Sequence, residues 1–116
     1  MELTMDRSEG TRGLLFKKPV YYLTVDMKFT PEELKLIKKH NWDKNPMCHP
    51  PRLAGIGDGA LHIGSFTRGK IEKYDFDSVG NLQAMENEII ENSKKLKGQL
   101  ETVAGFTSGG PRKIEL

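Results

Sequence analysis

The residues best suited to chemistry are the single cysteine and the three histidines of the chain. Cys48 and His49 are neighbours, while His40 and His62 lie on either side of them. Structural zinc sites usually carry ligands about two to four residues apart, a spacing that an adjacent pair does not provide. A cysteine nucleophile needs a lowered thiol pKa, an orienting group and an oxyanion hole, and the sequence demonstrates none of them. We therefore predict no metal, no cofactor and no catalytic residue, and we favour a protein that is not an enzyme.

Residues 42–59 form a long stretch without usable periodicity, and they include three prolines and three glycines. The glycines at 55–59 are typical of a phosphate loop, but such a loop leads into a helix, whereas these lead toward a predicted strand. Long irregular connections are usually functional or disordered. One hypothesis therefore makes the protein a small enzyme or ligand-binder that uses this loop, with Cys48, His49 and Arg52.

Basic residues concentrate in residues 35–52, around a predicted short helix and the loop after it. A positive groove beside an aromatic platform is how single-stranded nucleic acid is held, so nucleic-acid binding is an alternative function. Glu32, Glu33 and Asp43 in the same stretch count against it, and a solvated helix face also explains the lysines. The candidate contacts for nucleic acid or a ligand are Lys35, Lys38, Lys39, Trp42, Cys48, His49 and Arg52.

The 116 residues have an ordinary globular composition, with 36% apolar and 29% charged residues. A net charge of +2 is too small to indicate nucleic acid by itself. One cysteine excludes an intrachain disulfide and fits a reducing compartment. The N-terminus lacks a signal-peptide pattern, and no apolar run approaches the roughly 18 residues of a membrane helix. These features predict a cytoplasmic protein without a membrane partner.

Three segments have the periodicity of regular structure. Residues 20–29 alternate between apolar and polar side chains, as a half-buried strand does. A helix is predicted to begin after Thr30, with Pro31 at its first position and Glu33 placed to close a capping box, and to end near residue 40. Residues 78–105 carry apolar side chains at steps of three, four or seven, which predicts one long amphipathic helix.

The remaining segments carry weaker signals. Residues 60–77 predict a β-hairpin that turns at Arg68 and Gly69, and its register would place His62 opposite Asp75. Residues 13–16 predict a short edge strand. Residues 1–12 are expected to be a flexible leader and residues 106–116 a flexible tail. A single domain would then span residues 13–105.

An apolar pair on the predicted hairpin indicates where a partner could bind. Phe66 and Ile71 would lie on the face of the sheet opposite to the core, and Tyr22 would join them from its own strand. Clustered apolar side chains on a polar surface are typical of protein–protein contacts. We therefore predict a partner-binding surface at Tyr22, Phe66 and Ile71.

Together these patterns predict an α+β protein with two layers. A mainly antiparallel sheet of three or four strands would be covered on one face by a short helix and the long C-terminal helix. The favoured function is a small, non-catalytic, cytoplasmic protein-interaction module that forms a homodimer or docks on a larger protein. Nucleic-acid binding and a small enzyme or ligand-binder are the two alternatives.

Overall fold

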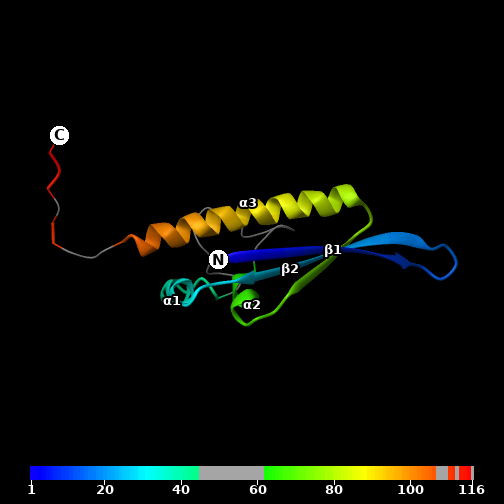
Figure 1. Ribbon diagram of the computed structural model, residues 1–116, viewed down its shortest axis with the longest axis horizontal. Helices are drawn as coiled ribbons and strands as arrows, with labels where there is room; N and C mark the ends of the chain where they lie inside the picture. Colours follow the sequence, from blue (N-terminus) through cyan, green and yellow to red (C-terminus); the bar gives the residue numbers. More distant parts are fainter. Residues whose placement is uncertain (45–61, 107–109, 112, 116) are drawn as a thin grey trace.

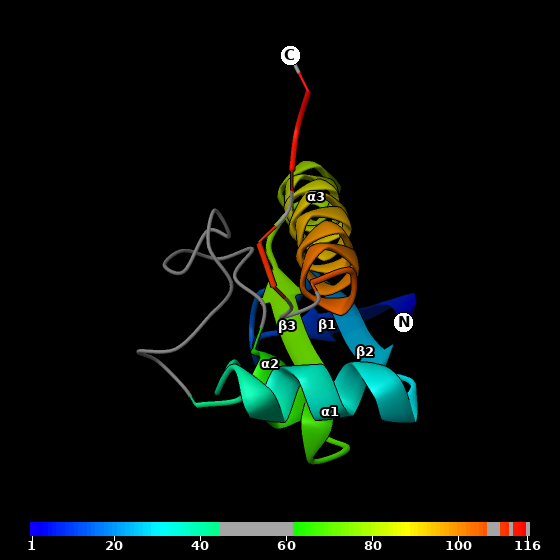
Figure 2. The same cartoon turned by 90° about the vertical axis from the view of Figure 1, so that its left-hand side faces the viewer.

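The structure is a computed structural model that describes residues 1–44, 62–106, 110–111 and 113–115. Its elements follow the order β1 (Glu2–Arg12), β2 (Lys18–Lys28), α1 (Pro31–Lys39), α2 (Ile63–Thr67), β3 (Glu72–Phe76) and α3 (Val79–Ala104). The strands form one antiparallel sheet in the order β1-β2-β3. Helix α3 runs along one face of this sheet, and α1 and α2 lie near one end of it (Figure 1; Figure 2). The fold is therefore α+β, as predicted.

Strand β2 is the centre of the sheet, and its alternation is confirmed. Leu23, Val25 and Met27 are at most 1% exposed, whereas the side chains between them are only partly buried. The apolar residues face α3, whose buried stripe includes Leu82, Met85, Ile89, Leu96 and Leu100. Burial of these two apolar faces against each other stabilises the fold through the hydrophobic effect.

Both predicted helix starts are confirmed. The Thr30 hydroxyl oxygen accepts a hydrogen bond from the Glu33 backbone N–H at 3.2 Å, and the Glu33 carboxylate accepts one from the Thr30 N–H at 2.8 Å. Helix α3 is capped by Ser78, whose hydroxyl accepts from the Asn81 backbone N–H at 3.1 Å. These bonds satisfy donors that a helix start leaves without partners.

The expectation that residues 1–12 are a flexible leader is wrong, because residues 2–12 form β1. Every residue of β1 is in register with β2, from the Glu2–Lys28 pair to the Arg12–Lys18 pair. Leu3 and Met5 lie opposite the buried Met27 and Val25 and extend the apolar face. Backbone hydrogen bonding to a strong neighbouring strand therefore orders a segment whose own hydrophobicity is low.

The hairpin predicted for residues 60–77 is also wrong, because residues 63–67 form α2 and β3 pairs with β2. Ile63 and Phe66, three residues apart, both bury on one side of this short helix, at 3% and 5% exposure. Gly64 lets the helix approach the preceding chain closely, because an added Cβ would lie 2.5 Å from the Asp43 carbonyl oxygen. The Ile63–Phe66 spacing thus satisfies the helical period rather than the strand period.

The predicted pairing of His62 with Asp75 fails together with that hairpin. His62 Nδ1 lies 3.3 Å from the carboxylate of Glu72, and Asp75 is joined to Arg12 of β1.

No helix in the described ranges is both long and apolar enough to cross a lipid bilayer. The described residues beyond Phe106 belong to no helix or strand, which leaves the predicted flexibility of the tail untested.

Candidate functional site

The loop between β1 and β2 carries the largest exposed apolar cluster of consecutive residues in the described chain. Leu14, Leu15 and Phe16 are 99%, 90% and 81% exposed, and we call these three residues the hairpin tip. The tip lies at the end of the molecule opposite to α1 (Figure 1). The edge strand predicted for residues 13–16 is therefore wrong, since these residues turn the chain instead of pairing.

Glycine at position 13 shapes this loop. Its φ of +113° is a backbone conformation that L side chains rarely adopt. An added Cβ would also collide with the Phe16 carbonyl oxygen, which the loop folds back over Gly13. A tight backbone turn, rather than contacts of the apolar side chains, therefore holds the tip residues outward.

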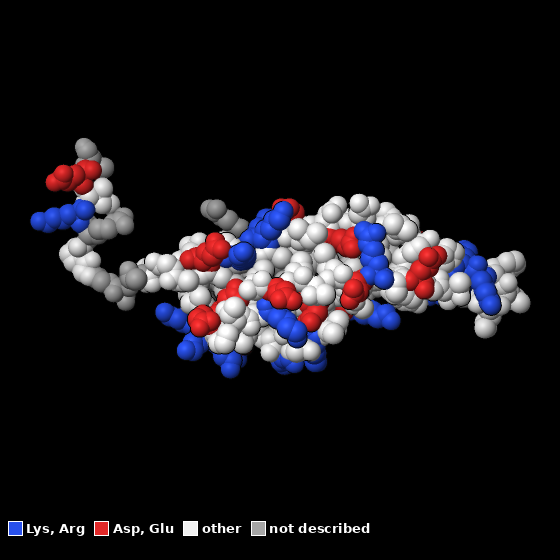
Figure 3. Space-filling view, viewed as in Figure 1, with Lys and Arg blue, Asp and Glu red and all other residues white. Residues whose placement is uncertain are grey.

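The surroundings of the hairpin tip are basic. Residues 10–20 contain three cations, Arg12, Lys17 and Lys18, and no acidic residue. Arg12 is joined to Asp75 of β3, and this hydrogen-bonded guanidinium lowers the pKa of the Asp75 carboxyl. Lys17 and Lys18 form no ion pair with any residue in the described ranges. Basic side chains lie beside the uncharged tip at the right-hand end of Figure 3.

The root of the same hairpin is fixed to α3. Arg7 Nε donates a hydrogen bond to Glu86 at 2.9 Å, and its second nitrogen pairs with the other carboxylate oxygen. This hydrogen bonding lowers the pKa of the Glu86 carboxyl. The start of α3 borders a hollow of about 320 Å³ whose walls come from both layers: Arg7, Ser8, Glu9, Tyr21, Val79 and Leu82. The start of α3 thus lies over the root of the hairpin, and the hairpin tip extends beyond it (Figure 1).

The partner surface predicted at Tyr22, Phe66 and Ile71 is not formed. Phe66 lies in the core, so its predicted outward position is wrong. Ile71 is 61% exposed, but it precedes Glu72, which pairs with Val25, three positions along β2 from Tyr22. Tyr22 is half-buried and lies under the ammonium of Lys73, 4.5 Å from the ring centroid.

The basic residues predicted to contact nucleic acid or a ligand are brought together only in part. Lys35 and Lys38 line a hollow of about 490 Å³ between α1 and α2, together with Arg68. Lys39 is exposed on the same helix. Trp42 is 7% exposed and stacks on His40 with 5.0 Å between ring centroids. Its ring is therefore in the core and does not offer an open platform for a base.

The last three predicted contacts, Cys48, His49 and Arg52, lie outside the described residues, as does most of the loop at 42–59. The hypothesis that this loop serves an enzyme or ligand-binder stays a prediction. In the part of the chain that the structure describes, no three His, Cys, Asp or Glu side chains are grouped to hold a metal ion.

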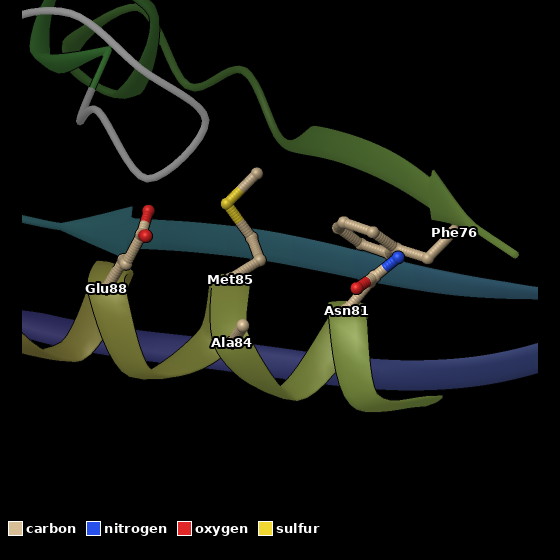
Figure 4. Close-up of a pocket in the computed structure, with 5 residues that line it drawn as sticks. All are labelled: Phe76, Asn81, Ala84, Met85 and Glu88. Atoms are coloured by element: carbon tan, nitrogen blue, oxygen red, sulfur yellow. The ribbon is translucent and has the colours of Figure 1, made fainter. Parts of the chain in front are cut away.

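A third hollow, of about 320 Å³, lies between the end of β3 and the first half of α3. Phe76 closes one side, and the helix contributes Asn81, Ala84, Met85 and Glu88 (Figure 4). Glu88 is the only charged residue in this lining. The hollow therefore has no second titratable side chain with which Glu88 could carry out acid–base chemistry. This hollow is therefore a weaker candidate than the hairpin tip.

No protein-family model, no curated protein and no solved structure matches the chain.

The hairpin tip is the feature that sequence patterns indicated least well. Its three apolar residues are visible in the sequence, between a glycine and the Lys17-Lys18-Pro19 run. Gly13 and Pro19 on the two sides of the run are residues typical of a turn. The strand propensity of the three apolar residues favoured a strand instead, which is why the prediction was wrong.

Proposed function

We propose that the protein is a non-catalytic interaction module that docks on a larger partner through the hairpin tip. The observation that carries this proposal is the exposure of Leu14, Leu15 and Phe16, each above 80%, at the end of a projecting hairpin. The same three side chains contribute no burial to the core of their own chain. An exposed apolar cluster with a polar surround is typical of a binding surface.

The size of the tip favours a reversible contact. Complete burial of each large apolar side chain stabilises a complex by about 1.5–3 kcal/mol, so three of them supply roughly 5–9 kcal/mol before costs. The loss of translational and rotational freedom opposes association by about 4–15 kcal/mol. The tip alone therefore supports weak binding, and neighbouring charges or a second contact must add to it.

The proposal replaces the surface at Tyr22, Phe66 and Ile71 with the hairpin tip and keeps the cytoplasm as the site of action. A protein partner, including a second copy of the chain, remains the expectation from the sequence. The experiment that tests the tip as the contact does not depend on the class of partner.

A photo-crosslinking residue at position 15 tests the proposal in the native cell. The control places the same residue at position 71, because Ile71 is also apolar and exposed. We expect adducts from position 15 that disappear when Leu14 and Phe16 are changed to serine, and few adducts from position 71. Equal yields at the two positions, or no adduct with either protein or lipid at position 15, would refute docking through the tip.

A second candidate function is supported by the hollow between α1 and α2. Lys35, Lys38 and Arg68 line it together with one acidic residue, Asp43. None of the three cations forms an ion pair with a residue in the described ranges. Such a surface could attract the phosphates of single-stranded nucleic acid, and binding of this kind weakens steeply as salt rises. A gel-shift titration at low salt tests it, with Lys38→Ala expected to weaken retention. Absence of retention by the unmodified protein would remove this candidate.

A further inference from the structure

We infer that the hairpin tip is a membrane-docking element that inserts Leu14, Leu15 and Phe16 among the headgroups of an anionic lipid bilayer. The inference rests on the proposed function, because it names the partner of the same site. It departs from the expectation of no membrane partner, which was based on the lack of a spanning apolar run. A tip that lies in the surface of a bilayer needs no such run.

The first argument is the shape of the tip. All three side chains are more than 80% exposed, so the apolar surface is convex and points outward around the turn. A protein groove must be shaped to enclose such a projection, whereas a fluid bilayer surrounds it from every side. The hairpin also ends beyond the start of α3, so a flat surface can reach the tip before it meets the body (Figure 1).

The second argument is charge complementarity. Lys17 and Lys18 directly follow the apolar side chains, and residues 10–20 contain no acidic residue. Arg12 lies two residues before Leu14, but its charge is paired with Asp75. Lys17 and Lys18 have no acidic partner in the described ranges and remain free to meet lipid phosphates. Each lysine or arginine near an anionic membrane surface strengthens binding about fivefold. Their long side chains can keep the charge at headgroup level while the tip lies deeper.

The third argument concerns depth. Backbone N–H and C=O groups of a turn are not all paired, and hydrocarbon offers them no hydrogen-bond partner. Glu9 and Asp75 lie behind the basic residues, and an anionic surface repels carboxylates. Both features limit insertion to the headgroup region, so the sheet and α3 stay in water.

Vesicle flotation with the full chain tests the inference. The vesicles contain phosphatidylcholine, alone or mixed with phosphatidylserine, at low and at physiological salt. We expect at least tenfold stronger binding to the phosphatidylserine vesicles, weakened by salt because the surface charges are screened. Failure of the unmodified protein to float with phosphatidylserine vesicles, or equal binding to both compositions, would overturn the inference.

Two variants and two matched controls locate the contact. We expect the triple change Leu14→Ser, Leu15→Ser, Phe16→Ser and the pair Lys17→Glu, Lys18→Glu each to lower binding at least tenfold. Ile71→Ser controls for the loss of an exposed apolar side chain, and Lys95→Glu with Lys97→Glu controls for net charge on the exposed side of α3. The controls should change binding less than twofold. Unchanged binding of the tip variant, with an unchanged circular dichroism spectrum, would refute the inference.

The inference and the proposed function can fail separately. If the protein does not bind vesicles while position 15 crosslinks to a protein, the tip docks in a protein groove and only the membrane inference is wrong. If position 15 yields no adduct and vesicles do not bind, both are wrong.

Discussion

Replacing Phe66 by alanine is expected to destabilise the protein strongly, and the same change at Phe16 is expected to have almost no effect. The two residues have the same side chain and opposite environments, since Phe66 is 5% exposed and Phe16 is 81% exposed. Phe66 packs in the cluster that also contains Ile63 and Trp42. The pair therefore measures burial with side-chain chemistry held constant.

The magnitude follows from the cavity that alanine leaves. Truncation of a buried phenylalanine costs about 3–5 kcal/mol of unfolding free energy. A domain of this size is stable by about 5–15 kcal/mol, so Phe66→Ala removes roughly a fifth or more of the total. At about 4 °C per kcal/mol, the Tm falls by roughly 12–20 °C. Phe16→Ala should change the unfolding free energy by no more than about 0.5 kcal/mol.

Urea unfolding, followed by circular dichroism and by the fluorescence of the single tryptophan, provides the measurement. Trp42 is buried in the same cluster, so its emission reports the loss of packing around α2. If Phe66 lay on the outer face of a hairpin, as the sequence patterns predicted, both substitutions would change the free energy of unfolding equally little. If Phe66→Ala costs no more than Phe16→Ala, then α2 does not pack on the core and the structural argument is refuted.

Four further substitutions test other parts of the fold by the same unfolding measurement. Thr30→Ala removes the side-chain cap of α1 and should cost about 1 kcal/mol, and an unchanged midpoint would contradict the cap. Gly64→Ala should lower the free energy of unfolding by about 1–3 kcal/mol, because the added Cβ would lie 2.5 Å from a carbonyl oxygen. At Gly80 in α3 an added Cβ meets nothing within 4 Å, so Gly80→Ala should stabilise the protein by up to about 1 kcal/mol. The Arg7 hydrogen bond lowers the pKa of Glu86, so the pair stabilises the fold above the ordinary carboxyl pKa of 4.5, and this contribution is lost as pH falls through the lower folded-state value. Glu86→Gln should therefore cost up to about 1 kcal/mol at neutral pH and nothing once Glu86 is protonated, and an equal cost at both pH values would contradict the ion pair.

The parts of the fold that sequence patterns predicted are those with strong local periodicity. Strand β2 alternates between partly buried and buried side chains from Tyr22 to Met27, α3 keeps an apolar stripe along its 26 residues, and α1 has a complete capping box. In each of these elements the local preference and the tertiary environment agree. Such agreement is what makes a pattern informative without knowledge of its neighbours.

The parts that were predicted wrongly depend on partners distant in the sequence. Strand β1 has only Leu3 and Met5 on its apolar face, and its order comes from pairing with β2. Helix α2 has two apolar residues three apart, a pattern too short to separate a helix from a strand. The strand that residues 60–67 were expected to supply to β3 is replaced by β2.

The exposure of the hairpin tip also depends on elements that are distant in the sequence. Leu14, Leu15 and Phe16 lie in water, whereas Ile63 and Phe66, which are also large apolar residues in a short segment, lie in the core. The difference is set by the length of the covering layer, because α3 begins over Arg7, Glu9 and Tyr21 and runs away from the tip. Beyond that point the hairpin has two strands and no helix above it, since β3 pairs with β2 only from Tyr21 to Val25. Apolar side chains at the end of such a hairpin have nothing to pack on among the described residues of their own chain, so we expect their burial to require a surface supplied from outside.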